Sequence, residues 1–524
     1  MVHSRGHDYD AIVVGAGHNG LVCAAYLAKA GRRTLLLEAR DSVGGTAASE
    51  RFAGATVNIC NCDHITFRTT PVIEELGLAA YGLRYLDVEP AQLNLSWEGG
   101  PAWPIFHELD RTLEALALTY PDEVEGYRRY AHDAIPAVRL VLAAAARPPS
   151  VPGLGRLVLR SGGRGTSTLL RWSRRSAAEV LRQYFHREAL LGPALLTGPM
   201  VWGVSPETPG TGLGALSYAL RHVGTVGRPI GGSGMVPLSL LQAFTAHGGT
   251  LRTGARVEEI RCDATGARAV RTTGGEEITA SVVVSACDPH RTFVRWLKNP
   301  PSGAEGLVQR WRRRAHHEGY ESKIDAVVTV LPRLRALRTD MFERLGGDPA
   351  RATVALAPTV ADMHAGAGLI PRGRVLERPG MLANAPSVLD PSMAPVGKHV
   401  FSLETLFTPY SLVGGWPGSG EPRRWLAAYA GLAEPGFLDA LDADGVWRAM
   451  TPDVYERDFH LAAGHAASFA GGPLAMLRNT DPELTRYATA VPGLFLTGAA
   501  TFPGAGIWGA SGRNCALTIL AASG

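Results

Sequence analysis

The chain has 524 residues, of which 46% are hydrophobic and 19% charged, a composition typical of a soluble globular protein rather than a disordered, collagenous or coiled-coil chain. Its 52 basic and 48 acidic residues leave a net charge of +4, which gives no reason to expect a nucleic-acid partner. Six cysteines, none in a C-x-x-C spacing, predict no disulfide framework, and we expect no metal site. The polar N-terminal residues run directly into an apolar strand, so we expect a cytoplasmic protein without a signal peptide.

The first forty residues predict a strand, a turn, a helix and a second strand. Residues 11–14 form an apolar run, residues 21–29 suit a helix, and residues 34–37 are apolar again. Between the first strand and the helix stands Gly15-Ala16-Gly17-His18-Asn19-Gly20, a G-x-G-x-x-G motif whose glycines allow a tight turn, the approach of a pyrophosphate and close helix packing. The arrangement predicts a dinucleotide site at the start of the helix, where free backbone N–H groups favour phosphate.

An acidic residue and a glycine doublet extend this site. Glu38 follows Gly20 by eighteen residues, at the end of the second strand. A carboxylate there accepts hydrogen bonds from a ribose diol, and its charge disfavours the 2′-phosphate of NADP. Gly44-Gly45 comes shortly afterwards, where backbone must approach a flat, extended ligand. We therefore expect residues 38–46 to belong to the nucleotide site.

The rest of the chain alternates between two characters. Residues 71–224 have a mainly helical pattern with a proline-rich break at 147–152, and residues 301–480 alternate strands and helices. Residues 225–300 return to the character of the opening unit, with a glycine-rich turn, a helix that ends at Gly248-Gly249 and a strand at 282–284. The last forty residues hold an apolar strand, a glycine-rich turn and a final helix. We predict one domain from residues 1–70, 225–300 and 481–524, and an inserted second domain from residues 71–224 and 301–480.

Stretches along nearly the whole chain resemble known flavoproteins. Residues 38–46 resemble FAD-binding proteins with the glutathione-reductase type of fold, and residues 491–499 look like the strand and turn that complete the FAD site. Together with residues 9–46, 229–235, 256–260, 281–289, 451–457 and 498–514, they make the chain similar to the phytoene-desaturase branch of the amine-oxidase flavoprotein superfamily. Within that branch it is most similar to the phytoene-dehydrogenase-related group that also contains pyridine nucleotide-disulphide oxidoreductase domain-containing proteins. The resemblance implies an α/β protein with a glutathione-reductase-type (Rossmann-like) FAD-binding domain and an inserted α+β substrate domain.

The motifs and the resemblance together assign the cofactor contacts. The residues expected to bind FAD are Gly15, Ala16, Gly17, Asn19, Gly20, Glu38, Ala39, Arg40, Gly44, Gly45, Thr46, Val257, Gly498, Ala499, Ile507 and Trp508. In relatives the position of Val257 contacts adenine through its backbone. Gly504–Gly509 repeats G-x-G-x-x-G, but the fifteen residues after it are too few for a second nucleotide domain. For Trp508, a wall of the flavin cavity and ordinary core packing both stay open.

The resemblance implies an FAD-dependent oxidoreductase that dehydrogenates an apolar or amphiphilic small molecule by hydride transfer to flavin N5. We expect oxygen or a quinone to reoxidise the flavin, because the sequence offers no second nucleotide domain. An amine oxidase acting on a C–N bond is one alternative, and a non-catalytic FAD-binding scaffold is another, since the glycine motifs serve all three equally. The oligomeric state stays open.

Two residues are candidates for the chemistry itself. Lys323 stands at the start of a predicted strand, where amine oxidases of this superfamily often place a lysine that is hydrogen-bonded through water to flavin N5. The alternative for Lys323 is a solvent-exposed side chain on an edge strand. His64 follows the glycine doublet and has the residue type of a base near neutral pH, with a hydrogen-bonded structural histidine as the alternative.

A basic stretch, residues 156–175, carries six arginines interleaved with leucines, valine and tryptophan. Such a stretch suits contact with anionic lipid at a membrane surface, which would serve an apolar substrate. Gly162, Gly163 and Gly165 interrupt it, which argues against a single amphipathic helix and leaves a solvated arginine-rich face as the alternative. For a second basic cluster, Arg310 to Arg314, we predict a solvated helix face.

Overall fold

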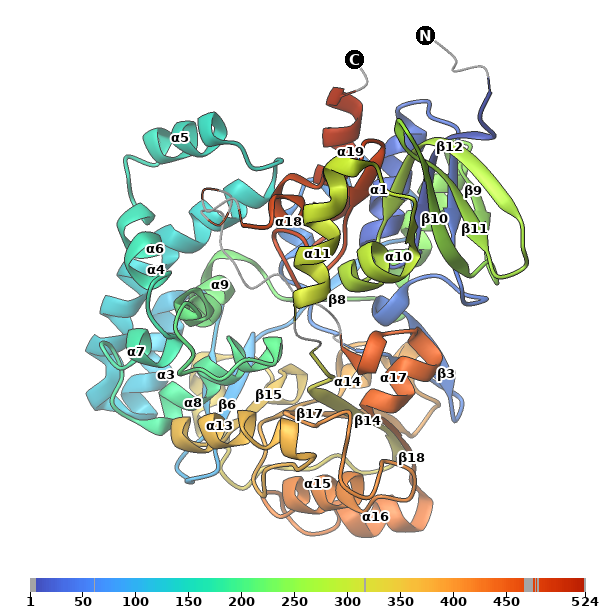
Figure 1. Cartoon of the computed structure of the whole chain (residues 1–524). Coiled ribbons are helices and arrows are strands. Elements are labelled where there is room, and N and C mark those ends of the chain that lie inside the picture. The colour runs from blue at the N-terminus through green and yellow to red at the C-terminus, as the bar shows by residue number, and fades with distance from the viewer. Residues whose placement is uncertain are drawn as a thin grey trace.

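The computed structural model describes residues 6–60, 62–314, 317–465, 475, 477 and 480–522, and two β-sheets organise them (Figure 1). The first sheet has the strand order β13-β10-β11-β12-β1-β2-β9, with β19 beside β12. Its strands are β1 (Tyr9–Val14), β2 (Thr34–Leu37), β9 (Thr250–Arg252), β10 (Val257–Asp263), β11 (Gly266–Thr272), β12 (Glu277–Ser285), β13 (Leu297–Lys298) and β19 (Leu494–Leu496). The predicted strands at 11–14, 34–37 and 282–284 are therefore neighbours in one sheet, with parallel pairing of β1 to β2 and β12.

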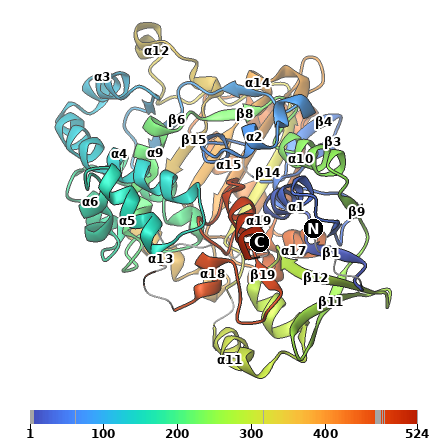
Figure 2. The same cartoon turned by 90° about the horizontal axis from the view of Figure 1, so that it is seen from above.

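Helices cover both faces of the first sheet because side chains alternate along its buried strands. Val13 and Leu36 belong to one hydrophobic cluster with α1 (His18–Lys29), α10 (Met235–Ala246) and α19 (Ala510–Ala522). Ile12 and Leu35 belong to another cluster, which includes Trp311 of α11 (Glu305–Arg313). Figure 2 shows α11 on the opposite side of β12 and β19 from α1 and α19. The helix α11 thus packs on the first sheet, although its residues lie in the second predicted domain.

The second sheet has the order β18-β14-β17-β16-β15-β6-β7. Its strands are β6 (Gln92–Ser96), β7 (Trp103–Ile105), β14 (Glu321–Val328), β15 (Val354–Ala357), β16 (Met381–Asn384), β17 (His399–Leu406) and β18 (Val446–Met450). One face, which includes Ile324 and Leu403, packs on α15 (Glu421–Ala430) and α16 (Phe437–Asp444). On the other face, Val327 and Val400 pack against β4 (Ala55–Asn58), the partner of β3 (Ser49–Phe52). The strands β6 and β7 were missed in a region predicted to be mainly helical.

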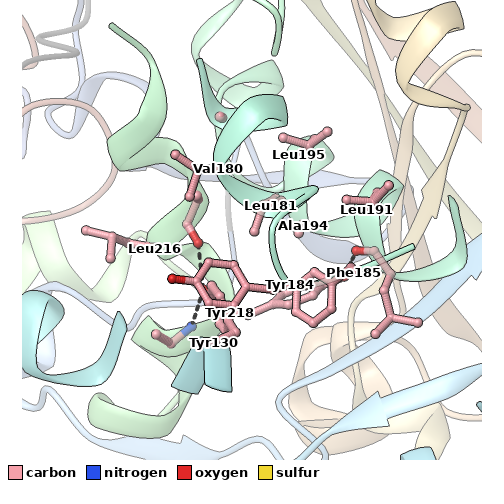
Figure 3. Close-up of a cluster of buried hydrophobic side chains, with 14 of the residues drawn as sticks. Tyr130, Val180, Leu181, Tyr184, Phe185, Leu191, Ala194, Leu195, Leu216 and Tyr218 are labelled. Atoms are coloured by element: carbon pink, nitrogen blue, oxygen red, sulfur yellow. Dashed lines mark hydrogen bonds between the residues drawn. The ribbon is translucent and has the colours of Figure 1, made fainter. Parts of the chain in front are cut away.

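A layer of helices adjoins the second sheet and has an aromatic core. Its helices are α3 (Leu109–Thr119), α4 (Val124–Ala145), α5 (Val151–Arg160), α6 (Thr166–Trp172), α7 (Ala177–Leu181), α8 (Glu188–Leu196) and α9 (Ser217–Val223). Figure 3 shows Tyr130, Phe185 and Tyr218 among the leucines of α7 and α8. The hydroxyl of Tyr130 donates to the carbonyl of Ala215 (2.6 Å) and accepts from the amide of Ala219 (3.1 Å), so its burial leaves no polar group unpaired.

The remaining elements connect these layers. The strand β5 (Tyr85–Asp87) pairs with β8 (Gly227–Pro229), and the short helices are α2 (Val72–Glu75), α12 (Thr339–Leu345), α13 (Val360–Ala367), α14 (Pro386–Leu389), α17 (Pro452–Phe459) and α18 (Pro482–Arg486). Among the described residues, no helix is both long and apolar enough to cross a membrane. The two sheets draw their strands from separate parts of the chain; the division into two domains stays a prediction.

Candidate functional site

The predicted nucleotide motif forms a turn between β1 and α1 in which each glycine meets a different constraint. Gly15 has φ +99°, a backbone conformation that L side chains rarely adopt. A Cβ on Gly20 would lie 2.0 Å from the carbonyl oxygen of Gly15, so α1 presses directly on the turn. A Cβ on Gly17, in contrast, would meet nothing within 4 Å. The N-terminus of α1 therefore opens onto free space at Gly17, and its first turn carries no acidic residue that would repel a phosphate.

Glu38 fixes a carboxylate beside this turn. Its Oε2 accepts a hydrogen bond from the amide of Ala16 (2.8 Å), and its Oε1 accepts one from the amide of Arg40 (3.0 Å). The side chain is buried, and the Glu38 carbonyl accepts from the amide of Ala255, just before β10. Val257 begins that strand with its side chain buried in the sheet core. The acid thus lies where the sequence predicts contact with a ribose.

Two buried polar atoms near the turn have no hydrogen-bond partner among the described residues. One is Oδ1 of Asn19 in the first turn of α1, and the other is Nη1 of Arg40. The Arg40 guanidinium also donates to Glu50 (3.2 Å) and lies 4.1 Å from the ring centroid of Phe459. Buried polar groups in native proteins nearly always have partners. Together with the free space at Gly17, these atoms fit a polar ligand such as the phosphate and ribose groups of a dinucleotide.

Distant segments meet at the same turn. Gly44, at φ +114°, donates its amide to the carbonyl of Ala16 (2.8 Å), which brings the glycine doublet Gly44-Gly45 against the first motif. At the other end of the chain, the Gly498 amide donates to Oγ of Ser511 (3.1 Å), in the first turn of α19. A Cβ on Gly512 would lie 2.1 Å from the Asn19 carbonyl oxygen, so α19 packs tightly on α1. Three other residues that are expected to bind FAD, Ala39, Thr46 and Ala499, are half-buried in the adjoining segments.

One hydrogen bond from a distant segment and one within the turn hold the final glycine-rich turn. The carbonyl of Ile507 accepts from Oγ1 of Thr66 (2.7 Å), and the indole of Trp508 donates to the carbonyl of Ala505 (2.9 Å). Trp508 is half-buried and packs against the cluster around Phe502. Both interpretations of Trp508, as cavity wall and as core packing, therefore stay open.

Lys323 is buried, and the alternative of a solvent lysine on an edge strand is wrong. Its strand β14 lies between β17 and β18, and only 4% of the residue is exposed. The ammonium donates to the carbonyl of Asn58 at the end of β4 (2.7 Å) and forms an ion pair with Asp325. Since a buried charge is tolerated only when it is paired, these contacts fix the ammonium at the junction of β14 and β4. Its role beside a flavin stays a prediction.

A pair of glutamates, which sequence reasoning missed, lies on the same face of the sheet as Lys323. Glu404 on β17 is directly opposite Lys323 in the antiparallel register, and Glu321 pairs with Leu406, so the two glutamates are diagonal neighbours. The thiol of Cys60 donates to Oε1 of Glu321 (3.7 Å). The alternation Glu321, Lys323, Asp325 on a predicted strand already indicated one polar face, but not that this face is enclosed.

Both glutamates hold a proton more readily than an ordinary carboxyl group. Burial raises the pKa of Glu321 to about 7. Burial, together with the negative charge of Glu321, raises the pKa of Glu404 to about 8, while the Lys323 ammonium acts in the opposite direction. Near neutral pH both carboxyl groups are therefore at least partly protonated. A group in this state can both accept and donate a proton.

His64 occupies a different, closed environment. Its Nδ1 is 2.9 Å from the hydroxyl of Tyr85, its Nε2 is 3.1 Å from Oγ of Ser233, and the residue is 1% exposed. Burial lowers the pKa of His64 to about 3, so the ring stays neutral. Because both ring nitrogens are engaged, the geometry favours the structural alternative over a catalytic base.

A protein family and several known proteins match this chain over most of its length. The model of the family described as flavin containing amine oxidoreductase matches residues 20–329. The chain is 28% identical to pyridine nucleotide-disulfide oxidoreductase domain-containing protein 2 of Rattus norvegicus, with 98% of this chain and 93% of that protein covered. It is 25% identical to a limonene dehydrogenase polypeptide of Castellaniella defragrans (97% and 94% covered) and to a lycopene-forming phytoene desaturase of a Paracoccus species (96% and 95% covered).

Solved structures show the same fold. A putrescine oxidase structure covers 98% of this chain and 99% of its own, with a TM-score of 0.62 and 18% sequence identity. At this identity the likeness establishes the mixed α/β fold alone. The predicted resemblance to the phytoene-desaturase branch of the amine-oxidase superfamily is confirmed, because the family match spans more than half of the sequence. The chain belongs to the family of flavin-containing amine oxidoreductases.

Proposed function

We propose that the protein is an FAD-dependent dehydrogenase of a small apolar or amphiphilic molecule. The observation that carries this proposal is that Gly17 and Glu38, from the first βαβ unit, and Gly498, from the far end of the chain, meet at one glycine turn with open space in front of it. In this proposal the first sheet with α1, α10 and α19 is an FAD-binding domain of the glutathione-reductase type. The second sheet and the helical layer are the inserted α+β substrate domain.

Each part of the turn has a task in holding the cofactor. The N-terminus of α1 at Gly17 receives the pyrophosphate, and Glu38 accepts hydrogen bonds from the adenosine ribose. The turn at Gly498 and the N-terminus of α19 complete the site from the far end of the chain. When bound, FAD supplies two-electron redox chemistry, accepting a hydride from a C–H bond. Oxygen or a quinone is the proposed final electron acceptor.

The polar face of β14 and β17 supplies a proton acceptor. Desaturation of a C–C bond removes a hydride from one carbon and a proton from its neighbour. Glu321 and Glu404, whose pKa values are raised toward neutrality, lie on this face and can accept such a proton in their ionised form, and the ammonium of Lys323 is held opposite Glu404. The apolar character of the substrate is supported by the names of two relatives, a limonene dehydrogenase and a phytoene desaturase.

Oxidation of an amine is the second candidate function. One specific observation favours it: two half-buried carboxyl groups lie as neighbours on one face of the second sheet and, when ionised, suit a cationic ammonium. The fold likeness to putrescine oxidase is compatible with either chemistry. A non-catalytic scaffold has no use for carboxyl groups whose pKa values are raised toward neutrality.

An anaerobic titration of the purified holoprotein separates these functions. Limonene or phytoene in detergent, and putrescine or cyclohexylamine in buffer, are added while the visible flavin absorbance is followed. Bleaching by a hydrocarbon, with loss of two hydrogens from the product, supports the proposal. Bleaching by an amine, with release of an aldehyde or ketone after imine hydrolysis, supports the second candidate. A flavin that dithionite reduces but no substrate bleaches contradicts both and favours a scaffold.

A further inference from the structure

The helix α5 is the most exposed helix of the helical layer. It lies above α4 and α6 at the upper left of Figure 1, and none of its residues is buried. Its outward face carries Val151, 60% exposed, and Leu159, 81% exposed. Exposed apolar side chains are common singly, but here Leu159 and Arg160 follow Arg156 at spacings of three and four residues, which places these three side chains on neighbouring parts of one helix surface.

The surroundings of α5 are strongly basic. Residues 134–178 contain eight arginines and no lysine, aspartate or glutamate. In the part of the chain that the structure describes, no ion pair involves Arg156, Arg160 or the following Arg164, and all three are exposed. The predicted interruption is real: α5 ends at Arg160, and the glycines of residues 162–165 lead into α6. The first half of the basic stretch nevertheless forms a complete amphipathic helix, capped by Ser150, whose Oγ accepts from the amide of Gly153 (3.1 Å).

The inner side of α5 lies against the final glycine-rich turn. Leu154 and Leu157 pack with Trp508 on the cluster formed by Ala144, Ala145 and Phe502. The helix therefore presents arginine and apolar side chains on its outer face, and its inner face contacts the turn that carries Trp508. A membrane surface bound to the outer face of α5 would therefore be separated from the Trp508 turn only by this helix.

We propose that α5 docks the protein on an anionic phospholipid bilayer, with Leu159 and Val151 entering the headgroup region and Arg156, Arg160 and Arg164 contacting lipid phosphates. Charge complementarity selects this occupant: the face has unpaired guanidinium groups, no carboxylate to repel headgroups, and apolar tips between the arginines. The attachment is peripheral. It does not depend on the reaction proposed above.

Cosedimentation of the purified full-length protein with vesicles tests the proposal. We expect the protein to pellet with vesicles of equal parts phosphatidylcholine and phosphatidylglycerol, and not with vesicles of phosphatidylcholine alone. The variant Arg156→Gln/Arg160→Gln is expected to bind about 30-fold more weakly, since each arginine near an anionic surface contributes about fivefold. The matched control is Arg312→Gln/Arg313→Gln on α11, which removes two exposed arginines of the second basic cluster and is expected to leave binding unchanged.

The apolar contribution has its own control. Leu159→Ser is expected to weaken binding about tenfold, whereas Val413→Ser, at a 73% exposed position in another part of the molecule, is expected to have no effect. All four variants alter exposed residues, and unchanged FAD content and thermal midpoint verify their folding. The proposal is overturned if both arginine variants lose binding equally, if the protein binds both kinds of vesicle equally, or if it pellets with neither. A protein that stays in the supernatant with every vesicle leaves an acidic protein partner as the alternative occupant.

Discussion

Replacing Gly17 by alanine separates cofactor binding from folding. A Cβ at this position meets no atom within 4 Å, and the backbone angles of Gly17, φ −65° and ψ 166°, are open to any residue. The free energy of unfolding of the apoprotein is therefore expected to change by less than about 1 kcal/mol. The methyl group occupies the space in front of the first turn of α1, where the proposal places the pyrophosphate. Loss of two hydrogen bonds to a charged group, at about 1.5 kcal/mol each, weakens FAD binding by about 100-fold or more.

Gly20→Ala is the matched control for this substitution. Its Cβ would lie 2.0 Å from the Gly15 carbonyl oxygen, a distance that requires α1 to move, at a cost of about 3 kcal/mol in apoprotein stability. FAD affinity is measured by fluorescence quenching on adding FAD to apoprotein, and stability by urea unfolding of the same preparations. If Gly17→Ala binds FAD as tightly as the wild type, the pyrophosphate does not lie at this turn, and the reasoning is refuted.

Three further substitutions address the chemistry. Burial raises the pKa values of Glu321 and Glu404 above the ordinary glutamate value of 4.5, to about 7 and about 8. The stability that their protonated forms contribute is therefore full below about pH 4.5 and is lost as the pH rises through about 8. Glu404→Gln is expected to flatten this fall in urea-unfolding midpoints, and an unchanged slope would show that the pKa of Glu404 is not raised. Lys323→Met leaves Asp325 without its lysine, so we expect the unfolding free energy to fall by about 3 kcal/mol and oxygen to reoxidise the reduced flavin more slowly in stopped-flow traces. The control is Lys298→Met, which alters an exposed lysine. Unchanged reoxidation removes Lys323 from that step. His64→Phe removes hydrogen bonds to Tyr85 and Ser233, so we expect the unfolding free energy to fall by about 2 kcal/mol. The rate of flavin reduction per bound FAD is expected to stay constant, and a lower rate would place His64 in the chemistry.

The nucleotide half of the molecule was largely accessible from sequence because its signals are local. The G-x-G-x-x-G turn, the strands around it and the distance to Glu38 are set by backbone geometry within one βαβ unit. Glu38 and the Gly17 turn are indeed neighbours, joined through the Ala16 amide. The helix at α10 and the strand at β12 were recognisable for the same reason, since each carries a strong apolar pattern of its own.

The second sheet and its polar face were not accessible in this way. The strands β6 and β15 are parallel neighbours although about 260 positions separate them, and no local pattern encodes such pairing. Whether Lys323 is exposed or buried depends on β18 pairing beside β14, more than a hundred residues later. That Glu321 and Glu404 are diagonal neighbours likewise depends on the register between β14 and β17, which only the folded sheet defines.

The flavin content of the purified protein tests the central claim most directly. Protein that has been freed of unbound nucleotide is denatured, and the released cofactor is identified and counted against the protein concentration. The account predicts a yellow protein that releases FAD at about one molecule per chain, and a Gly17→Ala variant that is folded but largely colourless. A colourless wild-type protein that neither contains FAD nor takes it up would contradict the account.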